Sequence, residues 1–345
     1  MAANSSTQAA GALFRQLRQE RNTTLQQIAD AQCSAAFISK FERGERDISF
    51  TRMRHLLDRI NVSVEEFMFQ LNAQSQEAIP RGQLFSMNVE LRHIHLSAAY
   101  FQPFLKLVQL NAQQNAFQLT EQDVQELTHA GDDVLMLGDG NSRWQRFYRI
   151  YRRILIAVAK TNLQGDYEHS DFASLDDMQH SFAEWSRPVT AYLYGVDRWG
   201  TFEFFMLRQF QTSMTLDALR RFTKLAVRRA AGTDFDANHE LLYGILQGAF
   251  TRFVAARAFQ DAAQCIEWHH ELNINEDTYY GLLNRFMGGW LLIHEGQVQT
   301  GKQQCERLIA LLKEIGLMHT ARLWHECLDM VIASYEQPTK FSIFW

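Results

Sequence analysis

The chain has 345 residues, 46% of them hydrophobic, and carries 34 Lys and Arg against 39 Asp and Glu, a net charge of −5. A single hydrophobic core stops growing at roughly 250–300 residues, so this length favours two domains or a repeat array. Only 4 prolines interrupt the chain, which predicts a helix-rich protein because proline breaks helices. No apolar run approaches the roughly 20 residues that cross a bilayer, and the N-terminus has no signal-peptide pattern. We therefore expect a soluble, cytoplasmic protein and exclude a membrane protein.

The spacing of cysteines and histidines argues against metal or cofactor chemistry. His269 and His270 are adjacent and would leave a helix on different sides, and the sequence has no H-E-x-x-H pair. The cysteines form no C-x-x-C pair, so we expect reduced thiols. The four of them are scattered along the chain: Cys33, Cys265, Cys305 and Cys327. The sequence predicts no metal site and no cofactor.

The charge is divided unevenly along the chain. Residues 11–69 hold nine Lys and Arg and eight Asp and Glu, whereas the rest of the chain holds 25 basic and 31 acidic residues. An acidic body is repelled by phosphate, so we expect any contact with nucleic acid to lie in the N-terminal part.

The first predicted helix lies within the sequence ALFRQLRQER. Helical periodicity gives it an apolar stripe made of Leu13, Phe14 and Leu17. Three basic side chains are left outside this stripe: Arg15, Arg18 and Arg21. This pattern predicts an amphipathic helix at the start of a small domain.

Four more short helices are predicted from capping residues. Thr24 begins the second helix, and Gln27 completes a possible capping box. The third helix ends at Gly44, a suitable left-handed terminator. Serine caps begin the last three helices: Ser34, Ser49 and Ser63. Five compact helices in about sixty residues are typical of a helix-turn-helix domain.

The third helix and the segment after it carry the most specific pattern. Ile38 and Phe41 lie on the inner face, and the sequence continues S-K-F-E-R-G-E, then D-I-S and LLDRINVSVEEF. Over residues 11–69 the chain resembles the DNA-binding domain of the Rgg/GadR/MutR regulators, a branch of the phage-repressor-like helix-turn-helix superfamily. The resemblance implies that this segment binds double-stranded DNA.

The resemblance also implies which residues contact DNA. Arg43 is one of the phosphate contacts given below, and for this residue an ion pair with a nearby acid inside the fold is an equal alternative. Five positions at the third helix are expected to face base edges: Ser34, Ala35, Ala36, Phe37 and Lys40. Five others are expected to contact phosphates and to set the docking register: Arg15, Gln26, Arg43, Arg46 and Ser49.

Three of the base-facing positions are apolar, where relatives carry polar side chains. Ala35, Ala36 and Phe37 can offer only apolar contact, chiefly to a thymine methyl group. We therefore expect specificity to rest on these contacts, on Lys40 and on DNA shape. The alternative is that Ala-Ala-Phe packs in a core and that the small domain binds proteins.

The rest of the chain predicts helices throughout. Residues 70–82 are polar and predict a linker. Residues 83–345 carry apolar residues at three- and four-residue spacing, for example over 144–160, without strand-like alternation. The predicted fold class is all-α, with a five-helix helix-turn-helix domain over 11–69 followed by a tetratricopeptide-like α-solenoid.

Internal repetition supports the solenoid. Two late segments each predict a helix, a short turn and a second helix, and their alignment pairs Ala262 with Gly301, a period of 39 residues. An earlier segment that starts at Trp199 fits a similar spacing. Stacked helix pairs of this length form a solenoid whose inner helices offer a concave binding face.

The C-terminal region is also similar to the Rgg family, through a W-G-x-x-E element formed by Trp199, Gly200 and Glu203. In that family the helical-repeat region dimerises and binds a short, mostly hydrophobic signalling peptide in its groove. The resemblance therefore implies a cytoplasmic quorum-sensing transcription regulator that acts as a homodimer.

A bound peptide needs polar partners for its backbone and apolar pockets for its side chains. The family resemblance implies that Arg153 is the first candidate for a bidentate contact with a peptide carboxylate. The alternatives are a solvated face for any one arginine and core packing for Tyr243. The full set of candidates is Arg149, Arg152, Arg153, Asn238, Tyr243 and Asn284.

Two functional hypotheses follow. In the first, a dimer presents two recognition helices about one DNA turn apart, roughly 34 Å, and binds two half-sites. Peptide binding shifts the geometry of the dimer or its contact with RNA polymerase. In the second, the chain is a helical-repeat scaffold or co-chaperone without salt-dependent DNA binding. The sequence has no nucleophile elbow, phosphate-binding glycine loop or pair of carboxylates on one face, so it does not predict an enzyme.

Overall fold

The chain divides into two compact units, residues 1–81 and 82–345, called the small unit and the larger unit below. This computed structural model describes residues 2–73, 107, 120–130, 143–164, 172–230, 236–272 and 277–337. Every regular element in these ranges is helical, which confirms the predicted all-α class. Residues 70–73 of the predicted linker belong to a helix, and 74–82 lie outside the described residues.

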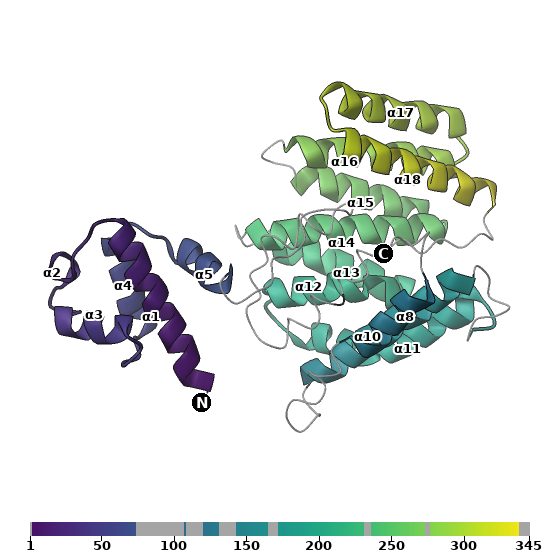
Figure 1. Cartoon of the computed structure of the whole chain (residues 1–345). Helices are drawn as coiled ribbons and strands as arrows, with labels where there is room; N and C mark the ends of the chain where they lie inside the picture. The colour runs from purple at the N-terminus through teal and green to yellow at the C-terminus, as the bar shows by residue number, and fades with distance from the viewer. Residues whose placement is uncertain are drawn as a thin grey trace. The chain divides into compact units, whose positions relative to one another are not determined.

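The small unit contains the five predicted helices: α1 (Ala2–Glu20), α2 (Leu25–Ile28), α3 (Ala35–Glu42), α4 (Phe50–Arg59) and α5 (Val64–Ala73) (Figure 1). The first helix begins well before residue 11, and Gln8 packs against Gly44. A Cβ at Gly44 would lie 2.9 Å from the Cα of Gln8, and Gly44 has a φ of +70°, as expected for a left-handed terminator. Residues before 11 therefore belong to the small unit.

The predicted helix caps are confirmed. The Gln27 N–H donates to Thr24 Oγ1 at 3.3 Å, and the Thr24 N–H donates to Gln27 Oε1 at 2.7 Å. The three serine hydroxyls accept N–H groups in the first turns of α3, α4 and α5: Ser34, Ser49 and Ser63. These contacts are local in sequence, which is why the residue pattern predicts them.

One prediction for α1 was wrong, since Arg18 does not lie outside the apolar face. Its side chain is buried, and Nε and Nη2 donate to Glu42 at 2.6 and 2.8 Å. A third donor, Nη1, reaches the carbonyl of Thr23 at 2.7 Å. Burial is tolerated because the charge is paired and its hydrogen bonds are made. The pair ties α1 to the C-terminal end of α3.

The turn between α2 and α3 is held by Asp30. Its Oδ1 accepts the N–H groups of Gln32 and Cys33 at 2.9 and 3.0 Å, and its Oδ2 lies within hydrogen-bond distance of His55 on α4. Two hydrogen bonds lower the pKa of the Asp30 carboxyl to about 2, and the bond from the Cys33 N–H has a larger effect than the bond from His55. His55 of α4 therefore helps to hold the turn between α2 and α3 in place.

The larger unit is a stack of helices that runs in Figure 1 from α10 and α11 to α17. Its buried side chains form one continuous core along the stack. The described helices are α8 (Glu121–His129), α10 (Arg143–Gln164), α11 (Leu175–Gly195), α12 (Thr201–Phe210), α13 (Leu216–Ala230), α14 (Asp236–Ala255), α15 (Phe259–Leu272), α16 (Thr278–His294), α17 (Val298–Glu314) and α18 (Met318–Glu336), with a 3₁₀ turn, η1 (Gln211–Ser213).

The 39-residue repeat is present in the hairpins α14–α15 and α16–α17. Ala262 and Gly301 are each the fourth residue of their second helix, and both are buried. Arg257 and Gly296, also 39 positions apart, turn the two hairpins with φ of +56° and +93°. A Cβ at Gly301 would lie 2.3 Å from the carbonyl oxygen of Gly289, so α16 and α17 approach closely at this residue.

The W-G-x-x-E element begins α12. The Glu203 carboxylate accepts the N–H of Gly200 at 2.8 Å and the hydroxyl of Tyr192 at 2.5 Å. Trp199 is buried, and its Nε1–H donates to the carbonyl of Leu193 at 3.3 Å. These contacts join the end of α11 to the start of α12, so the element has a structural role.

Within the described residues, no helix is long and apolar enough to span a membrane. The same ranges contain no cluster of three His, Cys, Asp or Glu side chains that could hold a metal ion. All four cysteines are buried thiols.

Candidate DNA-binding and ligand sites

Helix α3 presents part of the predicted base-facing surface. Ala36 and Lys40 are exposed and Ala35 is half-buried, whereas Ile38 and Phe41 are fully buried on the other side. The predicted inner and outer faces of this helix are therefore those of the structure. Arg15 on α1 and Gln26 on α2, both predicted phosphate contacts, are also exposed.

Two predicted DNA contacts already have roles as caps. Ser34 Oγ accepts the N–H of Phe37 at 3.3 Å, and Ser49 Oγ accepts the N–H of Arg52 at 3.4 Å. Both hydroxyls lie at the positive end of a helix dipole. Each serine therefore positions the first turn of a helix.

Arg43 makes an ion pair at the surface of the small unit. Its Nε and Nη2 donate to Glu45 at 2.6 and 2.9 Å, and its Nη1 donates to Ser39 Oγ at 2.6 Å. The hydrogen bond to Glu45 raises the pKa of Arg43. The ion pair given as one interpretation of this residue is therefore present, and its phosphate contact stays a prediction.

Phe37 is half-buried and packs against the core of the small unit. Two arginine side chains lie near its ring. The guanidinium carbons of Arg46 and Arg52 lie 5.4 and 5.0 Å from the ring centroid. Arg52, on α4, was not predicted as a functional residue. Its position two residues after Phe50 gave no signal, because the contact with Phe37 joins residues on two different helices.

The ion pairs of the small unit leave some cations without an acidic partner. Arg46 and Arg52 have no carboxylate within ion-pair distance among the described residues. The paired arginines are Arg18 with Glu42, Arg21 with Glu66, Arg43 with Glu45 and Arg59 with Asp30. The available positive charge therefore includes the two arginines over Phe37.

A second candidate site lies between α10 and α11, in a pocket of about 340 Å³. The guanidinium of Arg153 stacks on Trp185, with its carbon 3.6 Å from the ring centroid. Pro188 has no N–H, so the carbonyl of Glu184 receives no helical hydrogen bond from it. We call this site the arginine pocket, lined by Arg146, Arg149, Ile150, Arg153, Glu184, Trp185 and Pro188.

The arginine pocket has an excess of positive charge. It is lined by three arginines and one carboxylate, and that carboxylate, Glu184, lies 3.6 Å from Arg187. The spacing of Arg146, Arg149 and Arg153 places them on one side of α10. Arg146 was missed from the sequence, although the three- and four-residue spacing was a signal that could have found it.

Two of the other predicted peptide contacts are used within the fold. Arg152 donates to the carbonyl of Ala130, at the end of α8, at 3.0 Å. Buried Asn238 accepts the hydroxyl of Thr201 at 3.1 Å. The structure thus brings Arg149 and Arg153 together and leaves these two residues elsewhere.

Tyr243 and Asn284 lie together around a buried histidine. The ring of Tyr243 stacks on Tyr280 at 3.7 Å and meets the ring of His269 at 4.8 Å. Asn284 Nδ2 donates to the carbonyl of Ile266 at 2.7 Å and lies 3.4 Å from His269 Nδ1. Burial lowers the pKa of His269 to about 4. These side chains therefore form a packed, uncharged contact between α14, α15 and α16.

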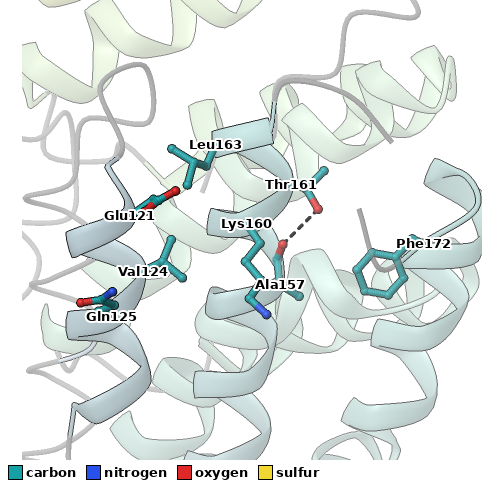
Figure 2. Close-up of a pocket in the computed structure, with 8 residues that line it drawn as sticks. All are labelled: Glu121, Val124, Gln125, Ala157, Lys160, Thr161, Leu163 and Phe172. Atoms are coloured by element: carbon teal, nitrogen blue, oxygen red, sulfur yellow. Dashed lines mark hydrogen bonds between the residues drawn. The ribbon is translucent and has the colours of Figure 1, made fainter. Parts of the chain in front are cut away.

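A further pocket, of about 310 Å³, lies between α8 and α10 (Figure 2). The Thr161 hydroxyl donates to the carbonyl of Ala157 at 3.0 Å. The polar groups that line it are of mixed type, whereas three arginines line the arginine pocket. Its lining residues are Glu121, Val124, Gln125, Ala157, Lys160, Thr161, Leu163 and Phe172.

Two family models match the chain. The model described as the C-terminal domain of the HTH-type transcriptional regulator Rgg matches residues 139–326, and a helix-turn-helix domain model matches residues 9–67. The first match spans more than half of the chain and includes the arginine pocket. No curated protein sequence matches the chain significantly.

Several solved structures share the fold at low sequence identity. A variant of the SHP pheromone receptor Rgg2 of Streptococcus dysgalactiae is 19% identical, with a TM-score of 0.62 over 97% of this chain and 99% of that one. A putative transcriptional regulator from Listeria monocytogenes EGD-e is 16% identical, with a TM-score of 0.69 over 95% and 98%. A PrgX/iCF10 complex is 12% identical, with a TM-score of 0.56 over 95% and 97%.

Proposed function

The chain belongs to the Rgg family of helix-turn-helix transcriptional regulators, and from this premise we propose that it is a homodimeric regulator controlled by a short hydrophobic peptide. In this proposal the small unit binds two half-sites of duplex DNA, and the larger unit holds the peptide in the arginine pocket. The observation that carries the peptide half is the cluster of three arginines beside Trp185. The protein would act in the cytoplasm, where promoter DNA and RNA polymerase are found.

The arginine pocket offers each kind of contact that a peptide end requires. Arg149 and Arg153 can bind a carboxylate with paired N–H donors. Ile150 and the ring of Trp185 supply an apolar surface for a neighbouring side chain. The carbonyl of Glu184 can accept a peptide N–H, since Pro188 does not occupy it. A free peptide carboxylate next to an apolar side chain fits this set.

The likeness to peptide receptors adds to the proposal. The S. dysgalactiae relative is described as a pheromone receptor, and another structure of the same fold is described as a bacterial peptide pheromone/receptor complex. Peptide binding would favour one of two states of the dimer and so change its affinity for DNA or its contact with RNA polymerase.

In the DNA half of the proposal, Ala35, Ala36 and Lys40 face base edges. The two alanines contact thymine methyl groups, and Lys40 reaches a guanine or a phosphate. Arg15 and Gln26 contact phosphates and set the register.

The peptide half is tested by fluorescence anisotropy with labelled short hydrophobic peptides, each made with a free C-terminal carboxylate and as an amide. We expect binding of the carboxylate form, and a loss of about tenfold or more in Arg149→Gln or Arg153→Gln, since each removes charged hydrogen bonds. Arg221→Gln, at an exposed position on α13, is the matched control. Equal binding by wild type and both pocket variants would remove the arginine pocket from the proposal.

The scaffold hypothesis is the second candidate, supported by the long helical stack. It predicts that duplex affinity is absent or independent of salt. A steep fall in affinity between about 50 and 200 mM salt, the range over which phosphate contacts lose about 10³–10⁵ in affinity, excludes it.

A further inference from the structure

The contact between Phe37, Arg46 and Arg52 brings two like charges to one small area. Both guanidinium carbons lie within 5.4 Å of the same ring centroid, so they can be no farther apart than the two centroid distances together. Arg46 comes from the segment between α3 and α4, and Arg52 comes from the first turn of α4. Three separate parts of the backbone therefore converge on this ring.

Among the described residues of the small unit, no carboxylate lies within ion-pair distance of Arg46 or Arg52. The other arginines with charged contacts there each lie beside a carboxylate, as Arg43 does beside Glu45. For Arg46 and Arg52 the ring face takes the place of the carboxylate, because an aromatic face attracts a cation but carries no net charge. The ring orders the two guanidinium groups and leaves their charge available to an external anion.

The surrounding backbone favours an anion as well. Phe37 is the third residue of α3 and Arg52 is the third residue of α4. Both helix N-termini, with their positive dipole ends, therefore adjoin the pair. Burial raises the pKa of the Cys33 thiol and the charge of Arg52 opposes this rise, so Arg52 also lies near the turn between α2 and α3.

We propose that Phe37, Arg46 and Arg52 form a phosphate clamp in which the two arginines bind one phosphate of the DNA backbone and Phe37 positions them. This inference rests on the proposed DNA binding and deepens it. It changes the role of Phe37 from a base-reading residue to a positioning residue. The thymine contacts of the recognition helix are then left to Ala35 and Ala36.

The clamp makes a prediction opposite to that of base reading. If Phe37 positions phosphate-binding arginines, replacing it lowers affinity for every duplex by a similar factor. If Phe37 contacts a thymine methyl, replacing it changes which sequence is preferred and leaves nonspecific affinity nearly unchanged. The two roles are therefore separable by measuring several duplexes.

The experiment uses the full chain and fluorescence anisotropy with promoter duplexes and an unrelated duplex, over a series of salt concentrations. The variants are Arg46→Gln, Arg52→Gln, the double variant, Phe37→Leu and Phe37→Tyr. Arg54→Gln, at an exposed position on α4, controls for general loss of charge. Thermal unfolding by circular dichroism shows which variants remain folded, and Phe37→Tyr keeps the ring face if Phe37→Leu does not fold.

We expect each single arginine variant to lower affinity about tenfold on every duplex and to reduce the slope of log affinity against log salt by about 0.9, the value of one phosphate contact. The double variant should add little, because the two arginines share one phosphate. Phe37→Leu should reduce the slope without any change in charge, and Phe37→Tyr should retain it.

Three results would overturn the clamp: additive slopes in the double variant, unchanged affinity in Phe37→Leu, or altered sequence preference with an unchanged slope. Failure of the proposed function is seen separately. If the wild-type chain binds no duplex with salt dependence, the DNA half of the proposal fails before any variant is compared.

Discussion

In the small unit Arg46 and Arg52 lie over the ring of Phe37, and in the larger unit Arg153 lies over the ring of Trp185. In both arrangements an arginine lies against an aromatic face, and in our proposals its charge is left available for a ligand. They differ in their surroundings. The ring of Phe37 is set in a surface between two helix N-termini, whereas Trp185 is one wall of a pocket.

This difference decides which ligands the two sites can distinguish. In our proposal Arg46 and Arg52 bind any phosphate within reach, because they do not lie in a pocket whose apolar wall could contact the group attached to that phosphate. The arginine pocket joins positive charge to the apolar surfaces of Ile150 and Trp185, so in our proposal it selects an anion by the side chain next to it. In our proposals the same contact would therefore serve sequence-independent binding in one unit and selective binding in the other.

Arg18 provides the contrast to both sites, because a carboxylate and not a ring holds it. Glu42→Gln leaves the buried guanidinium without its counter-charge, and we expect the small unit to lose about 3–5 kcal/mol of unfolding free energy. All 7 tryptophans lie after residue 81. Urea unfolding followed by circular dichroism should therefore change, while the transition followed by tryptophan fluorescence stays constant.

The matched control is Glu45→Gln, which removes the exposed partner of Arg43. A surface pair contributes about 1 kcal/mol or less, so the control should unfold close to the wild type. If Glu42→Gln unfolds no more easily than Glu45→Gln, the buried pair is not what fixes α3 against α1.

The two aromatic rings can be removed one at a time. Trp185→Leu takes away the stacked ring from Arg153 and should weaken peptide binding by about 1 kcal/mol, a factor of about five, because a cation–π contact is of that size. Duplex affinity without peptide should be unchanged. Phe37→Leu should give the reverse pattern, with weaker duplex binding and unchanged peptide binding. Loss of both functions in either variant would contradict two separate ligand sites.

The features that the sequence predicted are those with local causes. The caps at Thr24 and Ser49 join residues three apart, and the pairing of Ala262 with Gly301 follows from a repeated hairpin. The face of α3 was predicted correctly as well, because helical periodicity alone separates Ile38 from Ala36.

The features that were missed depend on contacts between distant helices. Arg18 pairs with Glu42 across 24 residues, and Arg52 of α4 lies by the ring of Phe37 of α3. In α10 the sequence grouped Arg149, Arg152 and Arg153, but packing against α8 and α11 decides which of them is used within the fold. Periodicity places a side chain on a face, and only the neighbouring helix determines its partner.

The smallest expected effect concerns Asp30, which holds the turn that presents α3. Its pKa in the folded chain is about 2, below its ordinary value of 3.8, because the Cys33 N–H and His55 stabilise the charged form. The carboxylate therefore contributes stability above about pH 4, and this contribution is lost as the pH falls towards 2. We expect the urea midpoint of the small unit, followed by circular dichroism, to decline over this window in the wild type and less in Asp30→Asn.

The matched control is Asp58→Asn, at an exposed position on α4, whose urea midpoint should decline as that of the wild type does. Parallel pH profiles for the wild type and Asp30→Asn would mean that the hydrogen bonds from Gln32 and Cys33, which an amide oxygen can also accept, hold the turn without the charge.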